Sequence, residues 1–502
     1  MKYLITCFVC CSLMFSSSFA GTPPIKTKKA AQLYVSHFEN VLGTSLEIKT
    51  STISAKQAIE VENIVLNEIT RLSSILSAYD TKSEFSNWLK TKNQPIAVSK
   101  DLFTVLSLFD QWHLQTAGAL SAAAETVNLV WKEAAAKNQL PTNDALTNAI
   151  AQTQQIHWTL DAANQTATHI SDAPLKLNSF AKSYIIKAAA NAAMAATKIN
   201  GILVNIGGDL VIAGNISENV QISNPKADAE NDAPIDNLIL SNKAVATSGN
   251  YRRGELINGV WYSHIIDPRT AKPAGEIISA TVVANAATDA GALATAFNVL
   301  STKESIALAA KYADVDYLII TKNGDRIESA NWKNLVVAKT AATTINAQTN
   351  WKNEVLIGLE LAQQPGFAKR PFAAVWVEDK DKNTVKTIAL WYNKARWLPD
   401  VREWFRKNGA PLASNPAAFS TITSATRSPG KYTLKWDGKD DQGAILKPGK
   451  YTIHIEVVRE HGGYDLLHQE IDCNDTPQQF NLKGNIELVG ASIEYKKKSA
   501  EN

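Results

Sequence analysis

The first third of the chain switches from a strand pattern to a helix pattern. In "ENVLGTSLEIKT", Leu46 and Ile48 fall on one face of a predicted strand, because successive strand residues point to opposite sides. The next segment places apolar residues three or four positions apart, which predicts a helix whose buried face is Val61, Val65, Ile69, Leu72 and Leu76. Residues 100–160 are rich in Ala and favour further helices.

The middle of the chain predicts short strands between two more helices. "FAKSYIIKAAANAAMAATKING" predicts a helix with Gly201 as its C-terminal stop. "ILVNIGGDLVIAG" predicts a buried strand that enters a tight Gly-Gly turn, and "AVATSGNYRRG" and "WYSHIIDP" predict short strands with turns. "ATDAGALATAFNVLS" predicts a helix whose core face is Leu293, Ala296, Phe297 and Leu300. This part of the chain is typical of an α+β domain.

The pattern changes after residues 341–352, a polar stretch that we interpret as a linker between a domain over 28–340 and one over 353–497. Beyond it, period-two alternation dominates. Phe372, Ala374 and Trp376 alternate in a first predicted hairpin. A second predicted hairpin alternates at Tyr432, Leu434, Trp436, Tyr451, Ile453, Ile455 and Val457. With Gly, Pro and Asp at the turns, this pattern predicts an all-β, Ig-like sandwich.

The N-terminus indicates export. Residues 1–20 combine an early Lys, a short apolar core and a small-residue cleavage site after Ala20, which is typical of a signal peptide. Cleavage would leave Cys473 alone and no internal disulfide; a lipidated Cys10 or Cys11 is the alternative. We therefore expect an exported, periplasmic protein, with association to the membrane left open.

Length and charge limit the partners further. The chain has 502 residues and a formal net charge of +3, with 51 Lys and Arg against 48 Asp and Glu. The sequence has no concentrated basic patch of the kind that binds the phosphate backbone of nucleic acids, so no nucleic-acid partner is expected.

Single residues leave alternatives open. Asp209 follows Gly207 and Gly208, which either bring backbone close to a ligand or form a tight turn with a capping Asp. Asp289 is either a helix N-cap or, with Thr295, part of a hard-cation site. Six positions separate Asp289 from Thr295, so they can act together only if the chain before Gly291 is not yet helical. His264 and Lys182 could equally be a packed histidine and a solvated lysine.

The order of these motifs resembles the ApbE family of exported flavin transferases. The matching stretches are "ENVLGTSLEI", "LSSILSAYDTKSEF", "AKSYII", "VNIGGDL", "AVATSGNYRRG", "YSHIIDPRTAKP" and "ALATAFNVL", spread over residues 35–340. The resemblance implies a T-fold-like domain. Residues 352–497 resemble a second domain often fused to ApbE, through "FAAVWVEDKDKNTVKTIALW", "RWLPDVREW" and "WDGKDDQGAILKPGKYTIHIEVVREHGGY".

The resemblance implies FAD:protein FMN transfer, in which the FMN phosphate of FAD becomes esterified to a Thr or Ser hydroxyl of a target protein and AMP leaves. Such phosphoryl transfer is expected to use Mg²⁺. His264 would be the base, because an imidazole titrates near neutral pH, and Asp209 would orient it or bind flavin. The other readings are an FAD pyrophosphatase and a non-catalytic flavin-binding or adhesion module.

By the same resemblance, several positions would contact the substrate or the metal. Those for FAD are Leu76, Ser77, Ala119, Leu120, Ser121, Lys182, Gly207, Gly208 and Ile266. Those for the metal are the Ser179 carbonyl, the Thr295 hydroxyl and a carboxylate, for which Asp289 is the candidate.

The chain also departs from the family pattern. The family usually has Asp where Lys176 stands, Gly at Ser183, and Gly-Ala-Phe-Asp where residues 118–121 read Gly-Ala-Leu-Ser. Its metal-binding Asp, four positions before the Thr, is Gly291 here.

The resemblance implies an acceptor protein that carries a Ser/Thr-Gly-Ala-Thr-like motif and belongs to a membrane redox complex. "STITSATRS" at 420–428 is a degraded form of this motif. We therefore weigh Thr426 in the chain's own second domain as an acceptor against a hydroxyl-rich sandwich turn.

Overall fold

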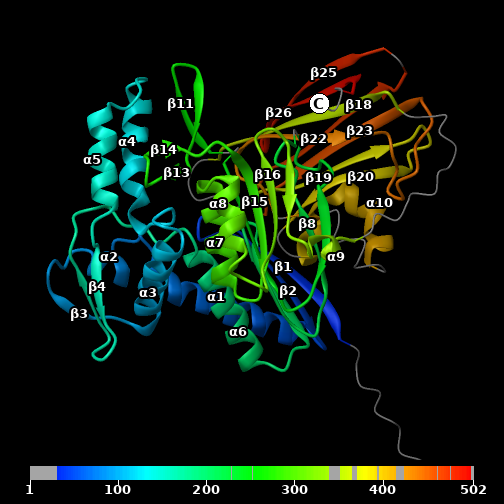
Figure 1. The fold of residues 1–502 in the computed structure, drawn as a ribbon. Coiled ribbons are helices and arrows are strands. Elements are labelled where there is room, and N and C mark those ends of the chain that lie inside the picture. The colour runs from blue at the N-terminus through cyan, green and yellow to red at the C-terminus, as the bar shows by residue number, and fades with distance from the viewer. Residues whose placement is uncertain are drawn as a thin grey trace, which may run out of the picture.

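The computed structural model describes residues 31–227, 229–250, 253–337, 351–364, 370–392, 395–413, 423–424, 426–460, 462–474 and 476–498. The predicted signal peptide and most of the predicted linker lie outside these ranges. The described chain forms a helix-covered sheet followed by a group of smaller sheets (Figure 1). Among the helices of these ranges, none is long and apolar enough to span a bilayer.

An antiparallel sheet of eight strands organises the first part, in the order β1-β2-β6-β7-β10-β15-β16-β17. The strands are β1 (Gln32–Val41), β2 (Thr44–Thr52), β6 (Gly201–Ile206), β7 (Asp209–Gly214), β10 (Ala244–Gly249), β15 (Ile277–Ala284), β16 (Asp316–Thr321) and β17 (Arg326–Glu328). Leu46 and Ile48 of β2 are both buried, as their alternation predicts.

Both faces of this sheet are covered. Helices α1 (Ala55–Leu76), α6 (Ala181–Ala196) and α7 (Ala287–Val299) pack on one face, and the predicted apolar positions of α1 and α7 are all buried there. The other face packs against the ribbon of β8 (Glu218–Ile222) and β9 (Asp236–Leu240) and against Trp332 of α9 (Trp332–Leu335). Figure 1 shows α1, α6 and α7 on one side of the sheet and β8 and α9 on the other.

The remaining elements of this part lie beside the sheet. They are α2 (Glu84–Trp88), β3 (Pro95–Ala97), α3 (Lys100–Gln115), η1 (Ala122–Ala124), α4 (Glu125–Ala136), α5 (Asn143–Thr153), β4 (Trp158–Asp161), β5 (Thr166–His169), β11 (Gly254–Ile257), β12 (Val260–Ser263), β13 (Ile266–Asp267), β14 (Lys272–Pro273) and α8 (Thr302–Ala309). Among them, α4 packs against the buried side chain of Ile266.

The second part is a sandwich of two sheets. One has the order β22-β18-β26-β25 and the other β21-β20-β19-β23-β24. A shared apolar core joins the two sheets. The strands are β18 (Asn353–Leu361), β19 (Phe372–Glu378), β20 (Thr384–Trp391), β21 (Thr423–Ser424), β22 (Gly430–Trp436), β23 (Lys450–Val458), β24 (Tyr464–Asp472), β25 (Gln478–Lys483) and β26 (Leu488–Lys497).

Two sequence-based expectations were wrong in detail, while the predicted β-sandwich is confirmed. Gly201 does not stop α6, which ends at a Thr197 cap, but opens β6. β22 and β23 do not pair as a hairpin, because β22 pairs with β18 in one sheet and β23 with β19 in the other. The sandwich also carries η2 (Ala395–Asp400) and α10 (Arg402–Ala413), where Trp404 packs on the face formed by Phe372, Ala374 and Trp376.

The two parts meet at the edge strand β22. The Asn231 side chain donates to the Lys435 carbonyl at 2.7 Å and accepts from the Lys435 N–H at 2.8 Å. These bonds satisfy backbone groups that an edge strand leaves unpaired. Arg370 Nε lies 3.2 Å from Glu39 Oε2, which ties the end of β1 to the second part.

Candidate functional site

The Gly-Gly turn between β6 and β7 sets Asp209 at the start of a strand. Gly207 and Gly208 have φ values of 59° and 96°, a left-handed backbone that favours glycine. Asp209 Oδ2 lies 3.0 Å from Lys182 Nζ in the first turn of α6. Burial raises the pKa of Asp209, while Lys182 and the Thr247 N–H oppose the rise. The structure therefore brings two predicted site residues into one ion pair.

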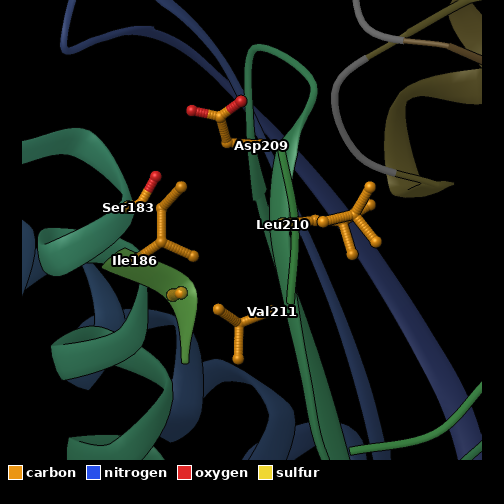
Figure 2. A pocket seen from close by; sticks show the side chains of 7 residues that line it. Ser183, Ile186, Asp209, Leu210 and Val211 are labelled. Carbon is orange, nitrogen blue, oxygen red and sulfur yellow. The ribbon is translucent and has the colours of Figure 1, made fainter. Parts of the chain in front are cut away.

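A small pocket opens beside this pair. It holds about 130 Å³ of empty space and is lined by Ser183, Ile186, Asp209, Leu210, Val211, Val245 and Ala287. Figure 2 shows the Asp209 carboxylate and the Ser183 hydroxyl at the same end of it, from β7 and α6. A water molecule does not fit inside this hollow, so in this form it admits no part of a dinucleotide.

Two of the predicted metal ligands are adjacent. Thr295 Oγ1 donates to the Ser179 carbonyl at 3.1 Å, which links α7 to the turn before α6. Oxygens bound side by side on an octahedral Mg²⁺, each at about 2.1 Å, lie about 3.0 Å apart. The spacing and the oxygen chemistry of this pair therefore fit a hard cation.

Asp289 does not join this pair. Helix α7 already includes it, since the Ala290 N–H bonds the Ala286 carbonyl at 3.1 Å. Six helical positions place Asp289 and Thr295 about 120° apart around the helix axis, on different faces of α7. Burial and the nearby Asp314 raise the pKa of Asp289, so it faces an acidic neighbour. The condition for a shared site is not met, and the described residues contain no cluster of three His, Cys, Asp or Glu suited to a metal.

Lys176 connects two segments that the family pattern assigns to FAD. Its Nζ lies 2.8 Å from Glu125 Oε1 and 5.1 Å from the centre of the Tyr79 ring, while its N–H bonds the Ala122 carbonyl. Lys132 Nζ is 3.3 Å from the same Glu125 oxygen. Burial would raise the pKa of Glu125, but the two lysines hold it below its usual value. Sequence reasoning missed Glu125 and Lys132, although the unusual Lys176 was a signal for a partner.

The other predicted FAD positions are mostly packed. Leu76, Ala119 and Leu120 are buried, which leaves their backbone as the part that can contact a ligand. Ser77 Oγ accepts from the Tyr79 and Asp80 N–H groups, and Ser121 Oγ accepts from the Ala123 N–H. These two hydroxyls thus fix their turns.

His264 is exposed at the end of the β11–β12 hairpin. Its Nδ1 lies 2.9 Å from the Arg253 carbonyl, a contact in which only a protonated Nδ1 can donate. Nε2 then carries the free lone pair. Partial desolvation of the ring by the surrounding chain lowers the pKa of His264, and the positive charges of Arg253 and Lys132 lower it further. The hydrogen bond to the Arg253 carbonyl opposes this shift. His264 has no hydrogen bond to Asp209 among the described residues, so Asp209 does not orient it.

Ile266 and its neighbours anchor the strand that follows His264. Ile266 is buried against α4. Arg269, three positions on, binds both Asp267 oxygens and reaches Glu304 at 3.0 Å. A side chain on Gly118 would contact Arg269, so this strand lies next to the segment at 118–121. Sequence reasoning missed Arg269 and Asp267.

Two family profiles match the chain, one for each part. The ApbE family profile matches residues 42–319, and a profile described as a predicted periplasmic protein (DUF2271) matches 355–489. An FAD:protein FMN transferase from Vibrio cholerae is 28% identical over 310 residues, which are 59% of this chain and 90% of that one. A protein of the same name from Treponema pallidum is 27% identical and is covered over 84%.

Solved structures share the fold of the first part. An ApbE protein from Thermotoga maritima has a TM-score of 0.54 at 25% identity, over 61% of this chain and 99% of that one. The flavin transferase ApbE from Vibrio cholerae has a TM-score of 0.51 at 22% identity, over the same shares. Since the family profile spans more than half of the sequence, the chain belongs to the ApbE family.

Proposed function

We propose that this protein is an exported FAD:protein FMN transferase, which moves FMN from FAD to a Thr or Ser hydroxyl of another protein and releases AMP. The observation that carries the proposal is the similarity to relatives of that name, aligned over 84% to 90% of their length. The periplasmic description of the second family supports an exported location.

His264 would accept the proton of the acceptor hydroxyl. The hydroxyl oxygen bonds the FMN phosphorus, the bond from that phosphorus to the bridging oxygen breaks, and AMP leaves with both electrons. The proton passes to Nε2, which is open because Nδ1 is held by the Arg253 carbonyl. A positioned base of this kind is worth about 10²–10⁴-fold in rate.

The ion pairs would position the substrate. Lys182 can reach a phosphate oxygen while it remains near Asp209, since its side chain is one-third exposed. Glu125 with Lys132 and Lys176 carries a net charge of about +1, which favours an anionic substrate beside His264. Bound Mg²⁺ supplies charge neutralisation at the phosphate oxygens. Ser179 and Thr295 would hold it.

We propose that the acceptor is a separate exported protein. Thr426 is 2% exposed, and no hydrogen-bond partner of its hydroxyl is found within the described residues. Arg427 beside it lies 3.3 Å from Glu230 of the first part. Modification of Thr426 would require this contact region to open. Mass spectrometry of the chain after turnover should find the Thr426 peptide unmodified; an added FMN mass there would identify an internal acceptor instead.

An assay of FAD cleavage tests the function. The chain is incubated with FAD and Mg²⁺, with and without a protein bearing a Ser-Gly-Ala-Thr segment, and FMN, AMP and flavinylated protein are quantified. AMP that forms only with the acceptor supports transfer. Free FMN with AMP in its absence indicates a pyrophosphatase. FAD binding without cleavage under any divalent ion would leave a flavin-binding module, and the proposal would be wrong.

A further inference from the structure

Two residue pairs, each four positions apart in the sequence, face one another between α6 and α7. Ser179 lies in the turn before α6 and Ser183 in its first turn, while Gly291 and Thr295 lie on α7. Thr295 Oγ1 is 3.1 Å from the Ser179 carbonyl. A Cβ atom placed on Gly291 would lie 2.3 Å from Ser183 Oγ. The oxygens of Ser179, Ser183 and Thr295 therefore line one contact between the helices.

The Ser183 hydroxyl is a buried polar group at this contact. It is 3% exposed, and no hydrogen-bond partner is found for it within the described residues. Buried hydroxyls almost always have a partner, because an unsatisfied one loses its bonds to water. Ser183 also lines the pocket beside Asp209 (Figure 2). A ligand atom bound next to this hydroxyl would satisfy it.

The position of the hydroxyl is that of a missing carboxylate oxygen. In an aspartate, the bond lengths place each carboxylate oxygen about 2.4 Å from Cβ. Ser183 Oγ lies 2.3 Å from the Cβ position of residue 291. Ser183 Oγ is therefore as far from the Cβ position of residue 291 as the carboxylate oxygen of an aspartate at that position would be. A side chain at 291 would therefore require the Ser183 hydroxyl to shift.

We propose that Ser183 supplies the third oxygen of a divalent-cation site, together with the Ser179 carbonyl and the Thr295 hydroxyl, in place of a carboxylate on α7. The inference rests on the proposed function, because the cation serves a diphosphate substrate. All three oxygens are neutral, whereas Mg²⁺ is usually held by one or two carboxylates plus substrate phosphates. The cation therefore binds weakly to the free protein and more tightly when a diphosphate is present.

Binding of Mn²⁺ tests this directly. Bound Mn²⁺ is measured by the loss of the free-ion EPR signal, with the full chain alone and with ADP as the diphosphate probe; ADP without protein gives the background. The variants are Ser183→Ala, Gly291→Asp and the double variant Ser183→Gly/Gly291→Asp. Ser305→Ala, another buried serine whose hydroxyl bonds the Phe297 carbonyl, is the matched control. Thermal melting verifies that each variant folds.

The expected results form a coupled set. Ser183→Ala weakens Mn²⁺ binding by about tenfold, and Ser305→Ala leaves it unchanged. Gly291→Asp alone gains nothing, because its Cβ meets Ser183 Oγ. The double variant binds at least about tenfold more tightly, without ADP, because it adds a charged ligand.

Two outcomes would overturn the inference: no Mn²⁺ binding by the wild type with or without ADP, or equal binding by wild type and Ser183→Ala. FAD cleavage is followed in the same samples. If cleavage persists while Ser183→Ala binds Mn²⁺ normally, the transferase proposal stands and only the ligand assignment fails. If the wild type does not bind FAD at all, the transferase proposal fails.

Discussion

Lys182 Nζ lies 3.0 Å from Asp209 Oδ2 and joins the first turn of α6 to the start of β7. Asp209 is buried, so its ionised state depends on a neighbouring cation more strongly than that of a surface carboxylate does. Helix α6 packs on the sheet at this point, and Asp209 of the pair lines the pocket.

We predict that Lys182→Met raises the pKa of Asp209 further, since it removes the cation that opposes burial. The free energy of unfolding should fall by about 2 kcal/mol, and FAD affinity should fall about tenfold. Urea unfolding and quenching of flavin fluorescence measure the two effects. Lys187→Met on the same helix is the control. In the double variant Lys182→Met/Asp209→Asn, the loss in free energy of unfolding should be smaller than the sum of the two single losses. Simple additivity would argue against an energetic coupling between the two side chains.

The second prediction concerns the pH profile of the transferase reaction. In the proposed mechanism the base is neutral His264. The pKa of His264 is lowered from 6.5, so the neutral form persists to lower pH. The acidic limb of kcat/KM should therefore have its midpoint below 6.5. His264→Gln should lose about 10²–10⁴-fold in kcat and lose this limb. A limb of unchanged midpoint in the variant would assign the titration to another group.

The third prediction tests the exchange at position 176. Lys176→Asp restores the residue usual in the family, but here it would place a second carboxylate beside the buried Glu125. Like charges repel in such a site, so we expect a lower melting temperature and weaker FAD binding. Lys132→Asp, at a more exposed lysine of the same cluster, should have a smaller effect. Tighter FAD binding by Lys176→Asp would contradict this expectation, because it would mean that Glu125 can move away from the new carboxylate.

The fourth prediction links acid stability to His37. This residue is 2% exposed and packs edge-on against Tyr392 of the second part, with Glu47 at 3.7 Å. Burial lowers its pKa to about 4, with Lys49 and Arg427 acting in the same direction. The unfolded chain thus takes up the proton first as the pH falls.

The free energy of unfolding should therefore decrease between pH 6.5 and about 4, by about 3 kcal/mol from this residue, and level off below. Chemical denaturation at several pH values measures the slope. His37→Phe keeps an aromatic ring against Tyr392 and should flatten the curve in this window. An equally steep curve in the variant would place the dependence on other groups, such as His157 and His454, whose pKa values burial also lowers.

The sequence alone determined the local elements and the family. The spacing of Val61 to Leu76 and of Leu293 to Leu300 predicted two helices whose named faces are buried, because a helix exposes one side every three to four residues. The two glycines before Asp209 predicted the turn that the structure shows. Contacts between distant segments could not be predicted in this way, because no local pattern specifies which strand pairs with which.

The tertiary structure alone decided the pairings. It separated β22 and β23 into two sheets, because the alternation of Leu434 and Ile453 tells which face is apolar but not which sheet receives it. It turned Asp289 away from Thr295 through the helical phase of α7. It also joined Lys176 to Glu125 across 51 positions, and Ser183 to Gly291 across two helices. Contacts between distant segments depend on packing of the whole fold, which the order of residues specifies only collectively.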